Sequence, residues 1–276
     1  MRHEARELDT NGARLNFQVW HPLGTPRATI LLVHGQGDHG GRYAHLGQAL
    51  TDAGYALAAV DVRGNGRSSG QRGDAPSYAV LLADVDRAVR EARPIAPTRH
   101  LFLLGHSMGG QLVTNYVIRG DVSLTGVILS SPWFRLALHL PWWKVRGGRL
   151  LARVMPTYTF PSTLTAAQLS QDASFRESVD PERLAHGRIT ARLAAELIDA
   201  GEAALRDAGV FDLSLLVLQA GRDTVIDAAA SKRFAERAGT PDRTFRLYPD
   251  SRHELFHDVD RERVIVDILE WIEPRL

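Results

Sequence analysis

A serine between two glycines carries the clearest chemical signal in this sequence. Ser107 lies in the stretch Gly-His-Ser-Met-Gly at positions 105–109, after an apolar run at 101–104 and before a segment of helical periodicity. A strand that turns sharply into a helix at Gly-x-Ser-x-Gly pushes the serine hydroxyl out above the sheet, close to the helix N-terminus. The glycines are needed because a β-carbon would clash where the backbone closes. The pattern therefore predicts a nucleophilic serine.

The serine needs two partners, because a hydroxyl is a weak nucleophile until a base removes its proton. In this architecture the partners follow the serine in the order acid, then histidine, on loops after later strands. Asp223 fits the acid because it follows the apolar run 215–218 and a glycine turn, with Asp227 as the alternative. His253 fits the base because it lies in a loop before the last predicted helix, with His257 as the alternative.

Two backbone N–H groups should stabilise the oxyanion that forms when the serine attacks. The loop at 34–43, which follows an apolar run at 30–33, has four glycines in ten residues, so its backbone can approach a reacting carbon closely. We expect the N–H groups of Gln36 and Met108 to be the two donors. The alternative is a flexible glycine-rich loop without a catalytic part.

Two polar segments could suggest a different chemistry. Asp38, His39 and Arg42 lie close together in the 34–43 loop, but their spacing is not typical of a metal site. The segment 61–70 contains Gly-x-Gly after an apolar run, but its surroundings do not match the strand, glycine turn and helix with a later acidic residue that a dinucleotide site requires. We expect both segments to brace loops, and we expect no metal and no organic cofactor.

Short uninterrupted apolar runs predict the strands that position these residues. They lack polar alternation, as expected for parallel strands that are covered on both faces. Segments of helical periodicity separate the runs, so the sequence predicts the α/β class with a mostly parallel sheet. An Asn-Gly turn at 11–12 should join two antiparallel strands at one edge of this sheet. The runs occupy residues 30–33, 57–60, 101–104, 127–129 and 215–218.

One long interval, residues 133–213, contains no comparable strand. A crossover needs only ~12–15 residues, so we expect an inserted helical cap at 135–209 and a core formed by 1–134 and 210–276. Within the cap, residues 142–153 combine two tryptophans with aliphatic and basic side chains. This segment either docks on a membrane surface or packs inward over the pocket with its arginines in solvent. An apolar lid suits an acyl chain better than a polar metabolite.

Composition narrows the class of protein. The chain has 276 residues, with 33 basic and 32 acidic side chains and a formal charge of +1, which removes the electrostatic case for a nucleic-acid binder. The absence of cysteine excludes disulfides, thiolate nucleophiles and cysteine zinc sites. No apolar run approaches the ~18 residues of a membrane span, and residues 1–7 lack the apolar core of a signal peptide. We expect a cytoplasmic protein, with peripheral membrane association only through the cap.

Five motifs together resemble the monoacylglycerol lipase and lysophospholipase group of α/β-hydrolases, also known as the serine aminopeptidase S33 group. The resemblance covers nearly the full length. It implies the α/β-hydrolase fold, a catalytic triad of Ser107, Asp223 and His253, and oxyanion donors at Gln36 and Met108. The motifs are His-Gly-Gln-Gly-Asp-His with Gly-Arg-Tyr at 34–43, Asp-Val-Arg-Gly-Asn-Gly-Arg-Ser at 61–68, Gly-His-Ser-Met-Gly-Gly at 105–110, Gly-Arg-Asp at 221–223 and His-Glu-Leu at 253–255.

The function expected from this resemblance is ester hydrolysis on lipids with a single acyl chain. A short-chain carboxylesterase or an aminopeptidase is the alternative of the same class, and a non-catalytic ligand-binding protein is the alternative of another class. Such binding proteins usually lose a member of the triad, whereas all three candidates are present here. Asn65 stands where the group often has histidine, and residues 169–172 resemble a cap motif of the group.

Overall fold

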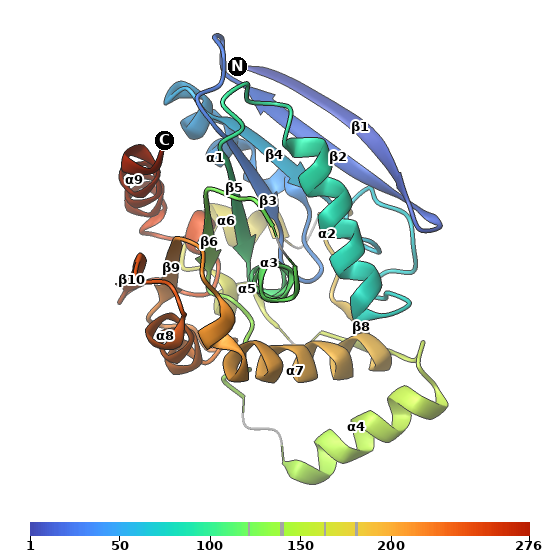
Figure 1. Cartoon of the computed structure of the whole chain (residues 1–276). Helices are drawn as coiled ribbons and strands as arrows, with labels where there is room; N and C mark the ends of the chain where they lie inside the picture. Colours follow the sequence, from blue (N-terminus) through green and yellow to red (C-terminus); the bar gives the residue numbers. More distant parts are fainter. Residues whose placement is uncertain (121, 139–140, 163, 180–181) are drawn as a thin grey trace.

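Eight strands form one twisted sheet in the order β1-β2-β4-β3-β5-β6-β9-β10 in the computed structural model, which describes residues 1–120, 122–138, 141–162, 164–179 and 182–276 (Figure 1). The pairs from β4 to β10 are parallel, whereas β1 pairs antiparallel with β2, and β2 with β4. The strands are β1 (Arg2–Thr10), β2 (Ala13–His21), β3 (Thr29–Val33), β4 (Ala56–Val60), β5 (Leu101–His106), β6 (Gly126–Ser130), β9 (Leu215–Ala220) and β10 (Arg243–Tyr248).

The apolar runs form the strands that were predicted from them. Every residue of β3, β4, β5, β6 and β9 is buried, as parallel strands covered on both faces require. The N-terminal hairpin turns at Asn11 and Gly12, both of which have positive φ angles. The predicted α/β class with a mostly parallel sheet is therefore confirmed.

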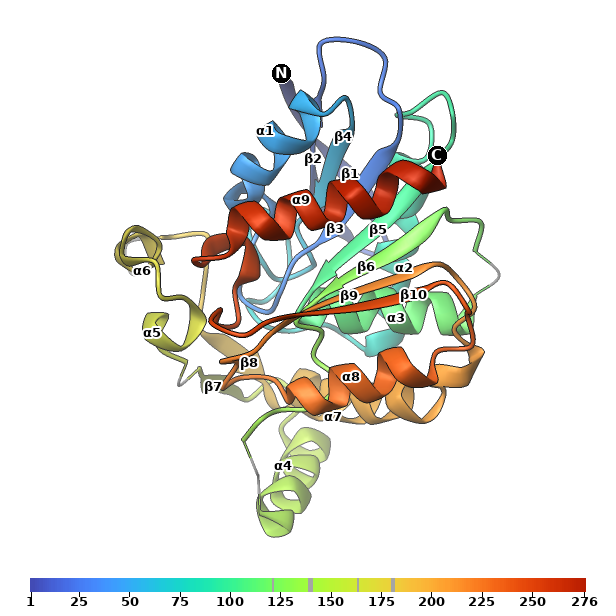
Figure 2. The same cartoon turned by 90° about the vertical axis from the view of Figure 1, so that its left-hand side faces the viewer.

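Helices cover both faces of the sheet. Alternate residues of β5 point to opposite sides, so that Leu103 belongs to the core cluster that includes residues of α2, α3 and α8, whereas Phe102 belongs to the cluster with residues of α1 and α9. In Figure 2, α1 and α9 lie in front of the sheet and α2 and α3 behind it. The helices are α1 (Ala44–Asp52), α2 (Tyr78–Ala92), α3 (Met108–Arg119), α8 (Ala228–Arg237) and α9 (Arg261–Ile272), with single 3₁₀ turns η1 (Gly40–Tyr43), η2 (Ala208–Val210), η3 (Leu255–His257) and η4 (Glu273–Arg275).

The proposed cap, residues 135–209, connects β6 to β9. Figures 1 and 2 both show α4 at its outer end, beyond α7. Its short strands β7 and β8 pair antiparallel and were not predicted, because three residues are too few to show a period. The elements are α4 (Trp142–Val154), β7 (Thr159–Pro161), α5 (Ala166–Leu169), α6 (Ala173–Val179), β8 (Arg188–Thr190) and α7 (Ala191–Arg206).

None of the helices in the described part of the chain combines the length and the apolar character that crossing a membrane requires.

Candidate active site

Ser107 occupies the sharp turn between β5 and α3. Its backbone has φ 51° and ψ −116°, a strained conformation for a residue with a side chain. A β-carbon at Gly105 would lie 2.6 Å from the carbonyl oxygen of Gly109, and one at Gly109 would lie 2.0 Å from that of Val33. Both positions therefore accept only glycine, for the reason that the sequence suggested.

His253 contacts Ser107 on one side and Asp223 on the other. Its Nε2 lies 3.0 Å from Ser107 Oγ, and its Nδ1 lies 2.8 Å from Asp223 Oδ2. Since a carboxylate can only accept, Nδ1 carries the proton, and Nε2 is left free to accept the serine hydroxyl proton. The other carboxylate oxygen of Asp223 accepts the N–H groups of Val225 and Ile226, each at 2.9 Å. These bonds hold the acid still behind the histidine.

Asp223 and His253 each shift the pKa of the other. Burial lowers the pKa of His253, but the charge of Asp223, the hydrogen bond to it and the charge of Glu254 together raise that pKa above its usual value. Burial likewise opposes ionisation of Asp223, yet His253 and the two N–H groups bring the pKa of Asp223 below its usual value. The pair thus favours a charged acid next to a base that can hold a proton.

The two alternative residues from the sequence lie elsewhere. Asp227 caps the N-terminus of α8, where its side chain accepts the N–H of Ala229 at 2.9 Å. His257 lies in η3, with its Nε2 at 3.1 Å from the carbonyl oxygen of Arg42. The structure therefore brings Asp223 and His253, rather than these two residues, to Ser107.

The glycine-rich loop after β3 passes directly against the serine. A β-carbon on Gly35 would lie 3.3 Å from Ser107 Cβ, so this backbone borders the space where a substrate carbonyl would sit. Gly37 has φ +76°, and its N–H donates to Asn65 Oδ1 at 3.0 Å. Asn65 thus supports the loop, at a position where the group that this sequence resembles often has histidine. Met108 is the first residue of α3, where an N–H has no acceptor within the helix.

The same loop is tied to the cap. The Gln36 side chain donates from Nε2 to the carbonyl oxygen of Arg188 at 2.8 Å, and the His186 N–H donates to the carbonyl oxygen of Gly37 at 2.8 Å. A β-carbon on Gly37 would lie 2.1 Å from the His186 carbonyl oxygen. The cap therefore lies in close contact with the backbone that we expect to bind the oxyanion.

Asp61 organises these loops, a role that the sequence did not indicate. Its buried carboxylate accepts the N–H groups of Gly40 and Arg67, each at 2.8 Å, and the side-chain amide of Asn16 at 2.9 Å. An aspartate at the end of a buried strand, followed by a glycine-rich turn, was the available signal. Arg63 in the same segment pairs with Asp84 in α2, so this segment braces loops.

The cap motif at 169–172 holds the loop that carries His253. The Glu254 N–H donates to the carbonyl oxygen of Leu169 at 2.9 Å. The buried Ser170 hydroxyl donates to the carbonyl oxygen of His257 at 2.7 Å, and the Gln171 N–H donates to an Asp258 carboxylate oxygen at 2.8 Å. This segment therefore fixes the position of the histidine loop, which its sequence alone did not reveal.

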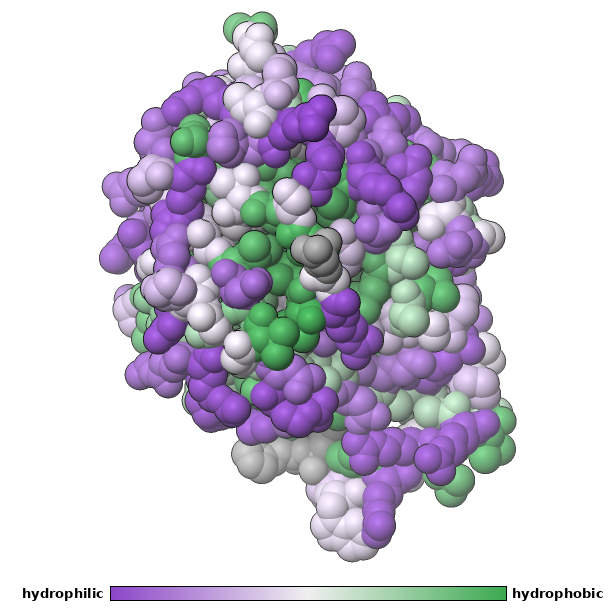
Figure 3. Space-filling model, in the orientation of Figure 1, coloured by the Kyte–Doolittle hydropathy of each residue, from purple (hydrophilic) through white to green (hydrophobic). Residues whose placement is uncertain are grey.

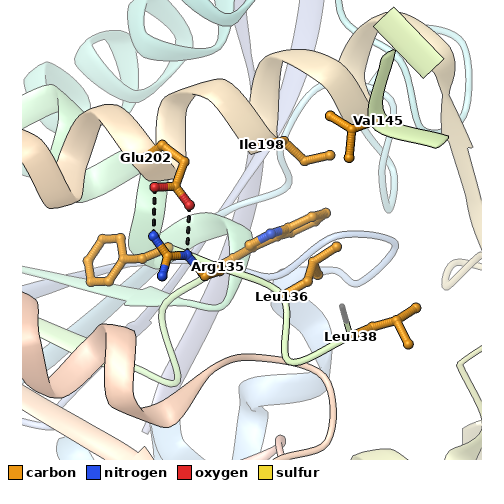
Figure 4. Close-up of a pocket in the computed structure, with 8 residues that line it drawn as sticks. Arg135, Leu136, Leu138, Val145, Ile198 and Glu202 are labelled. Atoms are coloured by element: carbon orange, nitrogen blue, oxygen red, sulfur yellow. Dashed lines mark hydrogen bonds and ion pairs between the residues drawn. The ribbon is translucent and has the colours of Figure 1, made fainter. Parts of the chain in front are cut away.

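A cavity of about 230 Å³ lies between α4, α7 and the chain that follows β6 (Figure 4). The Trp133 N–H donates to the Ser107 carbonyl oxygen at 2.9 Å, which ties one wall of the cavity to the backbone of the serine. The Ala137 N–H donates to the Val225 carbonyl oxygen at 2.9 Å, which ties the same wall to the loop of the acid. The lining residues are Trp133, Phe134, Arg135, Leu136, Leu138, Val145, Ile198 and Glu202.

Comparisons with known proteins identify the family and the fold of this chain. A family model described as serine aminopeptidase, S33 matches residues 24–260. The chain is 31% identical over 271 residues to an uncharacterised abhydrolase domain-containing protein of Dictyostelium discoideum, covering 98% of this chain but 29% of that protein. It is 29% identical to a monoacylglycerol lipase of Mycolicibacterium smegmatis, covering 100% and 98% of the two chains. The crystal structure of a Paleococcus ferrophilus monoacylglycerol lipase is similar with TM-score 0.86 and 28% identity, covering 95% and 99%.

Proposed function

This chain belongs to the serine aminopeptidase S33 family and has the α/β-hydrolase fold, and on that basis we propose that it hydrolyses carboxylic esters of lipids with a single acyl chain. Monoacylglycerols and lysophospholipids are the substrates of this class. Relatives named monoacylglycerol lipase, similar over nearly the full length, support an ester hydrolase. The observation that carries the proposal is the pair of contacts that joins Ser107 to His253 and His253 to Asp223.

In the first step, Ser107 Oγ forms a bond to the ester carbonyl carbon while His253 Nε2 takes the hydroxyl proton. The carbonyl oxygen becomes an oxyanion, to which we assign the N–H groups of Gln36 and Met108. Each such donor contributes roughly 3 kcal/mol to stabilising the transition state. Asp223 orients the imidazole and stabilises the imidazolium that forms.

In the second step, the bond between the carbonyl carbon and the alcohol oxygen breaks, and His253 gives its proton to the departing alcohol. The acyl group stays on Ser107. A water molecule then loses a proton to His253 as it attacks the acyl carbon, and the fatty acid leaves while the proton returns to Ser107. The sequence of proton transfers needs only the three side chains and water.

We assign the acyl chain to the cavity whose wall includes Trp133, the residue whose N–H donates to the Ser107 carbonyl oxygen. Its walls are mostly apolar, with Leu136, Leu138, Val145 and Ile198 contributed by the chain after β6 and by α4 and α7 (Figure 4). A buried methylene contributes ≈ 0.8 kcal/mol, so an apolar channel of this kind discriminates by chain length. Arg135 and Glu202 form a two-bonded ion pair in the lining, at 2.7 and 2.8 Å.

We further propose that α4 contacts a membrane surface transiently. None of its residues is buried, and Trp142 and Trp143 are 71% and 58% exposed. Its sequence contains four basic residues and no acidic one, and Figure 3 shows hydrophilic, pale and hydrophobic side chains side by side over α4 at the bottom of the view. Exposed tryptophans beside cations suit the headgroup region of an anionic bilayer. Of the two interpretations of the cap sequence, this exposure favours surface docking.

A substrate panel on the purified protein tests the proposed class. Monoacylglycerols and lysophospholipids of matched acyl chains are compared with short p-nitrophenyl esters and amino-acid amides. We expect the highest kcat/KM for long single-chain lipids. A maximum at short acyl chains would indicate a short-chain carboxylesterase, cleavage of amides instead of esters would indicate an aminopeptidase, and no turnover of any of them would indicate a ligand-binding protein.

A further inference from the structure

Glu254 is a buried carboxylate next to the site that the mechanism above does not use. Its side chain is enclosed by two histidines that are themselves buried. The Oε1 atom lies 3.2 Å from His106 Nε2, and the Oε2 atom lies 3.4 Å from His257 Nδ1. Burying a carboxylate costs free energy unless charges or hydrogen bonds compensate, so this arrangement requires a reason.

The contact between Glu254 and His106 runs parallel to the one between His253 and Ser107. His106 directly precedes the serine, and Glu254 directly follows the histidine. The two loops are therefore joined twice, at 3.0 Å through Ser107 and His253 and at 3.2 Å through their neighbours. The His106 ring also contacts the His253 ring, with their centroids 4.9 Å apart. A shift of Glu254 would thus move the imidazole that faces the serine.

The hydrogen-bond partners show where protons lie around Glu254. His257 Nε2 faces the carbonyl oxygen of Arg42 at 3.1 Å, so that nitrogen carries a proton. His106 Nδ1 lies 3.2 Å from the Ser130 carbonyl oxygen and 3.3 Å from Ser130 Oγ, so it has a partner in either tautomer. Both histidines are therefore held by partners on the side that faces away from Glu254.

Glu254 keeps its negative charge in this setting. Burial raises the pKa of Glu254, but the charges of His106 and His257 and their contacts with it bring that pKa well below the usual range. On the side of η1, Arg42 pairs with Asp38 at 3.2 Å and Tyr43 donates to Asp38 at 2.9 Å. The titratable and charged groups around Glu254 are His106, His253, His257, Asp38, Arg42 and Tyr43.

We propose that Glu254 is a positioning residue for the ester hydrolysis, one that holds His253 opposite Ser107 through His106 and whose charge stabilises the imidazolium formed during the reaction. This role rests on the proposed function of Ser107 and His253. It explains why a carboxylate is buried where an apolar side chain would cost less. It also explains why the contact between His106 and Glu254 lies beside the one between Ser107 and His253.

The direct test is Glu254→Gln, which removes the charge and keeps the shape. The profile of kcat/KM against pH is measured with a soluble p-nitrophenyl ester. Without the carboxylate the imidazolium is less stable, so the acid limb of the profile should move to lower pH by about half to one unit. We expect kcat to fall by about tenfold, with a smaller change in KM, because the imidazolium of the transition state loses the same interaction.

Three further variants separate this role from a merely structural one. Glu254→Asp keeps the charge, so its acid limb should stay near that of the unmodified protein while kcat falls through lost positioning. Asp267→Asn removes a carboxylate of α9 that is equally buried, 6% exposed like Glu254, and that accepts the Tyr248 hydroxyl of β10. It should lower the melting temperature without moving the limb. His106→Asn should lower kcat, and combining it with Glu254→Gln should add little.

The proposal is wrong if the acid limb of folded Glu254→Gln stays where it is in the unmodified protein, whatever the change in its thermal stability. If that variant does not fold, His106→Asn decides: an unchanged kcat in the folded variant overturns the proposal. Labelling of Ser107 by a fluorophosphonate in the unmodified protein keeps the two claims apart. An unmodified protein without such labelling contradicts the proposed function itself, whereas labelling together with an unmoved limb contradicts only the role of Glu254.

Discussion

The imidazole of His253 lies 3.0 Å from the hydroxyl of Ser107, although 146 positions separate the two residues in the chain. The parallel sheet makes this possible, because the loops at the carboxyl ends of β5 and β10 meet at the same edge. The strained turn at Ser107 places the hydroxyl at that edge, and the cap motif at 169–172 holds the histidine loop against it.

The pH dependence of kcat/KM should show an acid limb set by His253. Only neutral imidazole can accept the serine proton, so activity falls as the pH drops through the pKa of His253. Because that pKa is raised, half-maximal kcat/KM should lie above about pH 6.5, the usual value for histidine.

The variant Asp223→Asn tests whether Asp223 causes the raised pKa of His253 that sets this acid limb. It should move the acid limb to lower pH and reduce kcat by about 10⁴-fold, because the imidazolium loses its charged partner and Nδ1 loses its fixed proton. A limb that stays in place in folded Asp223→Asn would argue against Asp223 as the partner of His253.

Gly109→Ala should destabilise the protein by more than about 3 kcal/mol, since a β-carbon there would lie 2.0 Å from the Val33 carbonyl oxygen. Urea unfolding measures this change. Gly148→Ala is the control, because that glycine lies in α4 with open space around it, and alanine should stabilise the helix by about 0.5–1 kcal/mol. Equal effects of the two variants would contradict the steric account of the turn.

Ile198→Trp should shorten the range of acyl chains that the protein accepts. The larger side chain fills part of the cavity lined by α7 and α4, so kcat/KM for long-chain monoacylglycerols should fall roughly 10- to 200-fold. The rate on a short p-nitrophenyl ester is the internal control and should change little. A uniform loss on both substrates would mean that the acyl chain lies elsewhere.

Replacing Trp142 and Trp143 by serine together should weaken binding to vesicles that contain anionic phospholipid. Co-sedimentation measures the bound fraction. We expect the affinity to fall by at least about tenfold, because serine cannot replace the free energy that the two exposed indole rings gain when they enter the headgroup region. Leu23→Ser is the control, since Leu23 is exposed on the core between β2 and β3. Equal sedimentation of both variants and the unmodified protein would contradict the proposed surface contact.

The elements of the core could be predicted because each has a strong local pattern. Uninterrupted apolar runs marked β3, β4, β5, β6 and β9, and helical periodicity marked α3 after Ser107 and α9 near the end of the chain. A local pattern, Gly-x-Ser-x-Gly, also predicted the turn at Ser107, and a β-carbon on either flanking glycine would clash with the backbone. The roles of Ser107, Asp223, His253, Gln36 and Met108 stay predictions, which the geometry supports.

What could not be predicted depends on contacts between distant parts of the chain. The bond from the Glu254 N–H to Leu169 and the contact of Glu254 with His106 join residues that no local pattern connects. The tryptophans of α4 left two interpretations open, because an amphipathic helix can turn its apolar side chains inward or outward. Only the position of α4 beyond α7 shows that these rings face solvent.

The central claim is that His253 makes Ser107 a nucleophile, and covalent labelling tests it most directly. The purified protein is treated with a fluorophosphonate, and the modified residue is located by mass spectrometry. We predict one phosphonyl group on Ser107, none in Ser107→Ala, and a loss of about four to six orders of magnitude in turnover for that variant. Ser231→Ala, which removes a buried hydroxyl from α8, should behave like the unmodified protein. A folded protein that is not labelled at Ser107, or a Ser107→Ala variant that keeps its turnover, would contradict the account.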